Sequence, residues 1–177
     1  MRAITLATCV LAACLGVSMF GTDEPSSTAN SASWSGKAAA TYLDRRMVWW
    51  MGWEVVARDH NTFCVSCHTV VPYAMARPVL RATLAEQAPS TTERQLLANV
   101  TKRVRMWKEV EPFYPDEKRG VPKTAESRGT ESILNAVILV GYDVPTGRLG
   151  PDARLALENM WGQQLETGET RGAWSWL

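Results

Sequence analysis

The order of apolar and polar residues along the chain predicts a mostly helical protein. Residues 36–60 contain no proline, and apolar residues recur there at the three- and four-residue spacing of one helix face. Between residues 47 and 53 the segment is apolar nearly all round, which predicts burial on several sides. Charged residues interrupt the apolar run, so the segment does not fit a membrane span. The predicted inner face carries Leu43, Met47, Trp50 and Met51.

Two further helices are predicted before the middle of the chain ends. Pro72 suits the first turn of a helix over residues 72–87, with Pro78 inside it as a kink or a break. Ser90 and Glu93 then fit a capping box, in which each side chain accepts a hydrogen bond from a main-chain N–H group at the helix start. The apolar stripe after this cap consists of Leu97, Val100, Val104 and Trp107.

The C-terminal part predicts a long connection and two more helices. Residues 111–129 carry three prolines and two glycines, a composition typical of a surface loop. A helix over residues 130–143 is expected between Thr130 as N-cap and Gly141 as C-cap, although its Ile and Val content would also suit a buried strand. The last helix opens at Pro151. We therefore expect an all-α domain of about five helices in hairpin pairs, without a substantial sheet.

The N-terminus predicts export. Residues 1–20 have one positive charge and then an apolar stretch, the layout of a signal peptide, and residues 21–35 are small and polar, like a flexible spacer. The protein is thus expected in the periplasm or on the outer surface, with an uncleaved membrane anchor as the alternative. Residues 11–14, LAAC, resemble the lipobox of bacterial lipoproteins, which implies a lipid anchor on Cys14. Otherwise Cys14 is an ordinary apolar residue of a discarded signal.

Length and charge add few restrictions. The chain has 177 residues, which suits one domain with a substantial core, here residues 36–177. Lys and Arg together number 19 and Asp and Glu 18, so the net charge is near zero. No basic stripe indicates nucleic acid or an acidic membrane surface as a partner.

The candidate chemistry is concentrated in residues 64–68, Cys-Val-Ser-Cys-His. Two thiols separated by two residues can reach the two vinyl groups on one edge of a porphyrin, and the histidine that follows can ligate the iron. Cys64 and Cys67 are therefore predicted to bind one haem c covalently, with His68 as the axial ligand of the iron.

Three other uses of these residues compete with haem. A disulfide oxidoreductase places its C-x-x-C in a βαβ unit, which the helical pattern does not offer. A structural zinc site needs a fourth ligand, and His60 is the one candidate nearby. A structural disulfide explains both thiols in an oxidising compartment but leaves His68 to chance.

The sixth iron ligand stays open at this point. Thioether ligation by Met106 or Met75 ranks ahead of ligation by His60, which lies only four residues before Cys64. Core packing is the alternative for each methionine, and an iron without a sixth protein ligand is a further one.

Aromatic and basic residues near the motif could support a haem. The chain has eight tryptophans, and three of them directly precede the motif, where they would wall the porphyrin or fill space between helices: Trp49, Trp50 and Trp53. Three arginines would pair with haem propionates or else be solvated helix charges: Arg58, Arg77 and Arg81.

The C-x-x-C-H stretch in an exported chain resembles the attachment site of the c-type cytochromes. That resemblance implies covalent haem and single-electron transfer to a redox partner protein of unknown identity. The chain departs from the small soluble cytochromes c, whose methionine ligand lies in a loop, because Met106 falls inside a predicted helix.

Residues 154–177 resemble the Q-and-G-x-W repeats of squalene and hopene cyclases, with Gln163 or Gln164, Gly172 and Trp174 in the matching places. In that family the glutamine and tryptophan brace consecutive helices of an α/α toroid, which implies that this chain forms part of one. The acidic D-x-D-D motif does not occur, so the resemblance concerns the fold and not cyclase chemistry. A complete toroid needs roughly twice this length, so we expect a domain truncated at its C-terminus.

These patterns leave three hypotheses for function. The leading one is an exported monohaem electron carrier, more an electron-transfer protein than an enzyme. The second is a haem-based enzyme or small-molecule sensor with an open sixth position. The third is a cyclase-like helical scaffold with a redox-active C-x-x-C.

Overall fold

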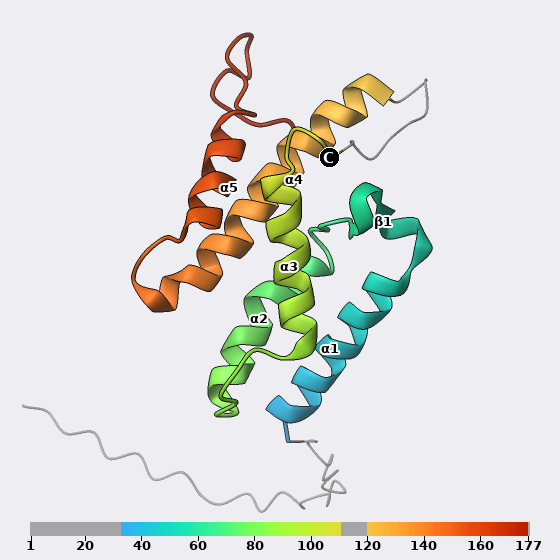
Figure 1. Cartoon of the computed structure of the whole chain (residues 1–177), viewed down its shortest axis with the longest axis vertical. Coiled ribbons are helices and arrows are strands. Elements are labelled where there is room, and N and C mark those ends of the chain that lie inside the picture. Colours follow the sequence, from blue (N-terminus) through green and yellow to red (C-terminus); the bar gives the residue numbers. More distant parts are fainter. Residues whose placement is uncertain (1–32, 111–119, 177) are drawn as a thin grey trace, which may run out of the picture. The chain divides into compact units, whose positions relative to one another are not determined.

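The computed structural model describes residues 33–110 and 120–176, which from Trp34 onward belong to one compact unit. Within these ranges the chain forms five α-helices and one small antiparallel sheet (Figure 1). The helices are α1 (Gly36–Gly52), α2 (Val70–Thr83), α3 (Thr91–Arg105), α4 (Gly120–Asp143) and α5 (Pro151–Trp161). The sheet pairs β1 (Ala57–Arg58) with β2 (Thr62–Phe63). The fold is thus mostly helical, as predicted.

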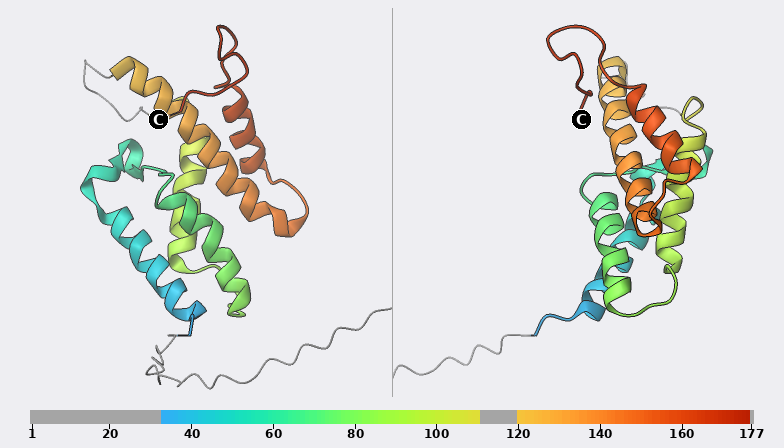
Figure 2. Two further views of the ribbon diagram at one scale, coloured as in Figure 1. Left: turned by 180° about the vertical axis from the view of Figure 1, so that it is seen from behind. Right: turned by 90° about the vertical axis from the view of Figure 1, so that its left-hand side faces the viewer.

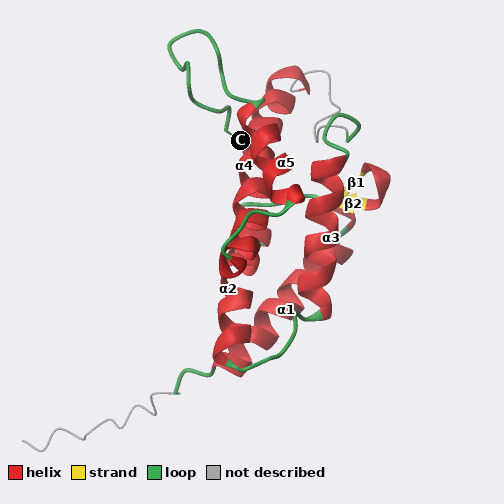
Figure 3. Ribbon diagram, turned by 60° about the vertical axis from the view of Figure 1, so that its left-hand side comes forward, coloured by secondary structure: helices red, strands yellow, loops and turns green. Residues whose placement is uncertain are grey.

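The helices pack around α3. Helices α1 and α2 lie side by side, as do α4 and α5 (Figures 1 and 2). Helix α3 contacts all four of the others. The β1–β2 hairpin lies against α3 (Figure 3) and connects α1 to α2. The connection between the first two helices is therefore fixed by a third.

The core forms where the inner faces of the helices meet. Full burial of a Val, Leu, Ile, Phe or Met side chain stabilises a fold by about 1.5–3 kcal/mol relative to exposure. The inner faces predicted from the spacing of apolar residues in the first and third helices are confirmed, because Met47 and Val100 are fully buried. The largest fully buried apolar or aromatic side chains are those of Met47, Val70, Tyr73, Leu96, Val100, Val104, Val110 and Ile138.

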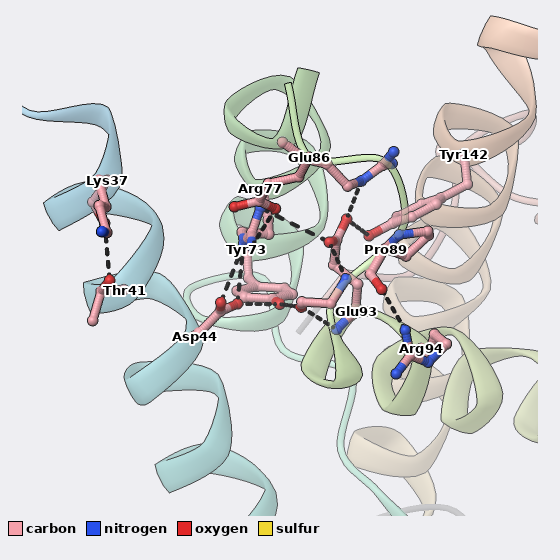
Figure 4. A network of polar contacts seen from close by, with 12 residues as sticks. Lys37, Thr41, Asp44, Tyr73, Arg77, Glu86, Pro89, Glu93, Arg94 and Tyr142 are labelled. Atoms are coloured by element: carbon pink, nitrogen blue, oxygen red, sulfur yellow. Dashed lines mark hydrogen bonds and ion pairs between the residues drawn. The ribbon is translucent and has the colours of Figure 1, made fainter. Parts of the chain in front are cut away.

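A polar network crosses this core between α1, α2 and the α2–α3 connection (Figure 4). Arg77, only 3% exposed, donates its Nε to the carboxylate of Asp44 at 3.1 Å and its Nη2 to Glu86 at 2.8 Å. Tyr73 donates its hydroxyl to the same Asp44 at 2.7 Å. Burial, with Asp44 as a further cause, raises the pKa of Tyr73. Arg77 is therefore a buried ion-pair residue and not a solvated helix charge.

Glu93 anchors the second half of the network. The predicted capping box is confirmed, since Glu93 N–H donates to the Ser90 hydroxyl and the Ser90 N–H donates to the Glu93 carboxylate at 2.8 Å. The same carboxylate, fully buried, accepts hydrogen bonds from Arg81 at 3.3 Å and from Tyr142 at 3.4 Å. One carboxylate thus both begins α3 and ties it to α2 and α4.

The first predicted helix is too long. Helix α1 ends at Gly52, and residues 57–63 turn back as the hairpin instead of continuing the helix to residue 60. His60 and Asn61 take positive φ angles, both 53°, in the turn of this hairpin. An Asn tolerates this region better than most residues. The sequence predicts no substantial sheet. Within the described ranges the only sheet is this two-stranded hairpin, which agrees with that prediction.

The fourth predicted helix is too short. Helix α4 begins at Gly120, so residues 120–129 are helical and not a loop. Thr130 lies inside α4 and is buried, and Gly141 also lies inside it, so neither is a cap. The helix α2 continues through Pro78.

Other expectations lie outside the described residues. These are the signal peptide over residues 1–20, the lipobox with Cys14, the spacer up to residue 32, and residues 111–119 of the expected loop. Among the helices of the described ranges, none has the length and apolar character that crossing a bilayer requires.

Candidate functional site

The C-x-x-C-H stretch connects the β1–β2 hairpin to α2. Cys64 follows β2 directly, and Cys67 and His68 lie in the turn before α2 begins at Val70. Asn99 of α3 holds the residue before the motif, because its Oδ1 accepts from the Phe63 N–H at 2.8 Å and its Nδ2 donates to the Phe63 carbonyl at 3.0 Å. A side chain from another helix thus replaces a missing strand partner for Phe63.

The main chain of Cys64 is held at both of its polar groups. Its N–H donates to the Val56 carbonyl at 2.8 Å. Its carbonyl accepts from the indole N–H of Trp50 at 2.9 Å. Trp50 therefore fixes the motif from α1 and does not line the cavity described below.

Ser66 fixes the middle of the motif by starting α2. Its hydroxyl accepts from the Thr69 N–H at 3.0 Å, and its carbonyl accepts from the Val71 N–H at 3.1 Å. These bonds satisfy main-chain donors that the first turn of a helix would otherwise leave without a partner. The turn that carries Cys67 and His68 is consequently anchored on both sides.

The three reactive side chains of the motif lie around one cavity. Cys64, Cys67 and His68 all line a space of about 350 Å³, within the range that small ligands occupy in proteins. Both cysteines are free thiols, and the Sγ of Cys67 lies 3.3 Å from the Nδ1 of His68. The opposite wall is α4, which contributes Ser127, Thr130, Glu131 and Leu134. The remaining lining residues are Arg58, Val65 and Ser66.

A buried ion pair supports the α4 wall of this cavity. Arg103 of α3, only 2% exposed, donates through Nε and Nη2 to both oxygens of Glu131, with the Nη2–Oε2 distance at 2.9 Å. Its Nη1 donates to the Thr62 hydroxyl at 2.6 Å. Arg103 therefore joins α3, α4 and the hairpin at one point.

The surroundings of Cys64 change the pKa of its thiol. Burial raises the pKa of its thiol, and the charge of Arg58 acts in the opposite direction. Because the shift is upward on balance, Cys64 is a neutral thiol at neutral pH and not a thiolate.

The structure separates the three candidates for the sixth iron ligand from this cavity. Met75 is 62% exposed and lines a different groove, between α2 and α4. Met106 is the residue at which α3 ends, and His60 lies in the hairpin turn with its Nε2 3.6 Å from Asp59. None of the three is among the residues that line the cavity.

Of the arginines and tryptophans predicted to support a haem, some lie at the cavity and others do not. Arg58 lines the cavity and donates to the main-chain oxygens of Val55 and Ala57, whereas Arg77 and Arg81 are engaged in the polar network of the core. Trp107, predicted on the apolar stripe of the third helix, is buried, whereas Trp161 of α5 is exposed.

Sequence reasoning missed Asn99, Arg103 and Glu131. Arg103 has exposed charged residues close by, Lys102 and Arg105, whereas Glu131 lies between two buried polar residues, Thr130 and Ser132. One signal was present for Asn99 and Arg103: they fall on the same side of α3 as Val100 and Leu96, the apolar face. A polar residue on an apolar face implies a specific partner.

The residues present are chemically suited to covalent haem. In the described ranges, no three His, Cys, Asp or Glu side chains converge on a point where one metal ion would bind. Attachment of haem c requires no such convergence, because the two thiols bind the porphyrin edge and only the imidazole binds iron. Two free thiols, one imidazole and the apolar side chains of Val65 and Leu134 share the cavity.

The C-terminal residues that resemble a cyclase repeat also come together. Gln164 forms a bridge with Trp174 and donates its Nε2 to the Gly172 carbonyl at 2.8 Å. The indole of Trp174 donates to the Met160 carbonyl at 2.6 Å. These contacts fasten the C-terminal segment to the end of α5.

Comparisons with known proteins add no family to this picture. No family model matches the chain, and neither a curated protein nor a solved structure matches it.

Proposed function

We propose that the chain is an exported monohaem c-type cytochrome-like protein that transfers single electrons. The observation that supports this proposal is the shared cavity of Cys64, Cys67 and His68, next to a main chain anchored from three helices. When bound, haem c supplies a one-electron iron couple. The function rests on the residues that would attach and position it.

Each residue of the motif has a defined part in this proposal. Cys64 and Cys67 would each add a thiol across one vinyl group, which forms a thioether bond and consumes the thiol proton. His68 is exposed beside the same cavity, so its imidazole is accessible as the axial ligand. The neutral state of Cys64 is compatible with this addition, because the S–H group itself is the reactant.

Covalent haem is the direct test. The chain is expressed together with a cytochrome c maturation system, and the product is analysed by a haem-stained denaturing gel and a pyridine haemochrome spectrum. We expect one covalent haem per chain, and none after Cys64→Ala with Cys67→Ala. The change His68→Ala should alter the visible spectrum, whereas an unchanged spectrum would sink the assignment of His68 as axial ligand.

The spin state distinguishes the electron carrier from a haem-based enzyme or sensor. A sixth protein ligand gives a low-spin iron, and an open position gives a high-spin iron that binds added imidazole or cyanide. The changes Met106→Leu, Met75→Leu and His60→Ala identify the ligand, because only the ligating residue alters the near-infrared spectrum when it is replaced. Since the structure places none of the three on the cavity, an open position is the competing outcome.

A dithiol switch is the second candidate function. The contact of 3.3 Å between Cys67 Sγ and His68 Nδ1 favours it, because an imidazole beside a thiol can accept its proton. Cys64 and Cys67 would form a disulfide by giving two protons and two electrons to a disulfide-bearing oxidant. Absence of covalent haem, together with an oxidised pair that dithiothreitol reduces, would favour this function.

Export and the toroid are further parts of the proposal. If residues 1–20 are a cleaved signal peptide, the mature chain is shortened by that segment. If Cys14 is acylated, the mature chain carries a lipid. Mass spectrometry of the exported protein distinguishes the two. Membership of an α/α toroid is supported by the Gln164–Trp174 bridge. An experimental structure in which α4 and α5 do not form one hairpin of a partial ring would contradict it.

A further inference from the structure

The outward face of α1 carries aromatic and basic side chains in one stripe. Tyr42, Arg46, Trp49 and Trp53 follow one another at spacings of four, three and four residues, which places them on one side of a helix and its end. Three aromatic residues on this side are between 41% and 56% exposed: Tyr42, Trp49 and Trp53. In Figures 1 and 2, α1 runs along the flank of the unit opposite to α5.

The exposed charges on α1 have one sign. Lys37, Arg45 and Arg46 are exposed on α1. The one acidic residue of the helix, Asp44, turns inward and pairs with Arg77. Beside the aromatic stripe, α1 therefore presents the two cations Arg45 and Arg46 and no carboxylate of its own, and the exposed carboxylate of Glu54 follows the helix directly after Trp53.

Side chains of the stripe contact one another on the surface of α1. The rings of Trp49 and Trp53 are stacked, with centroids 5.2 Å apart. The guanidinium of Arg46 lies over the ring of Trp49, 4.4 Å from its centroid. A cation over an exposed indole can stay in contact with the ring while its charge faces an anion.

We propose that this face of α1 binds an anionic lipid surface. Tryptophan and tyrosine rings are amphipathic and favour the headgroup level of a bilayer, and arginine side chains extend to phosphate groups. The stripe from Tyr42 to Trp53 spans eleven residues, or about 16 Å along the helix, so α1 would lie along the membrane plane.

The position of α1 in the sequence favours a lipid surface over a protein partner. Helix α1 is the first element after the predicted lipobox, and Gly36 lies 22 residues (36 − 14) beyond Cys14. One lipid chain gives only marginal membrane binding, and a second signal is needed for stable anchoring. The α1 face would supply this second signal, and it does so whether or not the chain carries haem.

Vesicle binding tests the proposal. The full chain with Cys14→Ser, which removes the predicted acylation site, is sedimented with phosphatidylcholine vesicles and with vesicles that also contain phosphatidylglycerol. We expect binding only to the anionic vesicles. The change Arg45→Gln with Arg46→Gln should weaken it about twenty-five-fold, since each cation near an anionic surface contributes about a fivefold factor.

Matched controls separate a specific face from general charge and apolarity. Arg148→Gln with Arg154→Gln removes two exposed cations outside α1 and should leave binding unchanged. Trp49→Ser with Trp53→Ser should weaken binding, and Trp161→Ser, which replaces a tryptophan of α5 that is 57% exposed, should not. Circular dichroism confirms that each variant is folded.

Three results would overturn the proposal. The first is the absence of binding to anionic vesicles, and the second is an equal loss in both arginine pairs. The third is capture of an acidic flavodoxin, used as a probe protein, through Arg45 and Arg46 without any vesicle binding.

Discussion

Replacement of Arg103 tests whether a buried ion pair holds the wall of the candidate site in place. Arg103 is 2% exposed and gives hydrogen bonds to the Glu131 carboxylate of α4 and to the Thr62 hydroxyl of β2. The change Arg103→Met keeps much of the volume but leaves the Glu131 charge without its partner. Loss of one member of a buried pair costs about 3–5 kcal/mol. The Glu131 side chain is 15% exposed, so water relieves part of this penalty and we expect about 3 kcal/mol.

A double-mutant cycle isolates the pair from other effects of the substitution. Glu131→Leu alone strands the Arg103 guanidinium and should also be destabilising. The double change Arg103→Met with Glu131→Leu removes both charges and should be more stable than either single variant. The free energy of unfolding is measured by urea denaturation of the chain without haem, followed by circular dichroism.

An exposed pair between α3 and α5, whose arginine lies on the same helix as Arg103, is the control. Arg105 and Asp152 have the same two-pronged geometry as the buried pair, but the Arg105 side chain is 62% exposed. Solvent screens such a pair, so Arg105→Met should not shift the urea midpoint measurably. The reasoning is refuted if Arg103→Met costs less than about 1 kcal/mol, or if the two single effects simply add in the double variant.

The remaining predictions concern the motif and its supports. Because burial raises the pKa of the Cys64 thiol, its alkylation in the haem-free chain should still accelerate at a pH where an ordinary thiol has reached its plateau. Arg58→Gln should push that pKa higher and slow alkylation at neutral pH, and mass spectrometry that resolves the modified cysteine would reveal an opposite sign. Asn99→Ala leaves the N–H and carbonyl of Phe63 unpaired and should cost about 2 kcal/mol in urea denaturation, so an unchanged midpoint would disprove the role of this contact. Gly129→Ala would place a Cβ 2.2 Å from a main-chain oxygen of the C-terminal segment, so limited proteolysis should cut that segment faster than in the parent chain; equal rates would show that the close approach is not essential.

The sequence predicts those elements whose signals are local. Ser90 and Glu93 begin α3 as a capping box because both halves of the signal lie within four residues. Likewise, Met47 is buried where the spacing of apolar residues places it. Helix α5 begins at Pro151, since a proline suits the first turn of a helix.

The wrong predictions arise where contacts between residues far apart in the sequence determine the structure. The apolar pattern continues after Gly52, but the chain turns back at Asp59–Asn61, and the Phe63 main chain bonds to Asn99, 36 residues away. Glu93 and Arg103 have charged side chains typical of a surface, and only their partners on other helices explain their burial. A signal for the turn was present in Asp59 and Asn61, which are frequent turn formers.

In the candidate site, the main chain is held by hydrogen bonds while the reactive side chains are left free. The Trp50 indole donates to a main-chain carbonyl of the C-x-x-C-H stretch, and the side chains of Asn99 and Ser66 accept from main-chain N–H groups beside it. The side chains of Cys64 and Cys67 remain free thiols beside a cavity. A site that must form covalent bonds at two fixed sulfur atoms needs this combination, because a loose backbone would not hold both thiols at one edge of a planar ligand. Trp50 also belongs to α1, so the helix that presents the aromatic and basic stripe is the one that holds the Cys64 carbonyl. If α1 binds a lipid surface, the candidate haem site is thereby tied to the same membrane-facing helix.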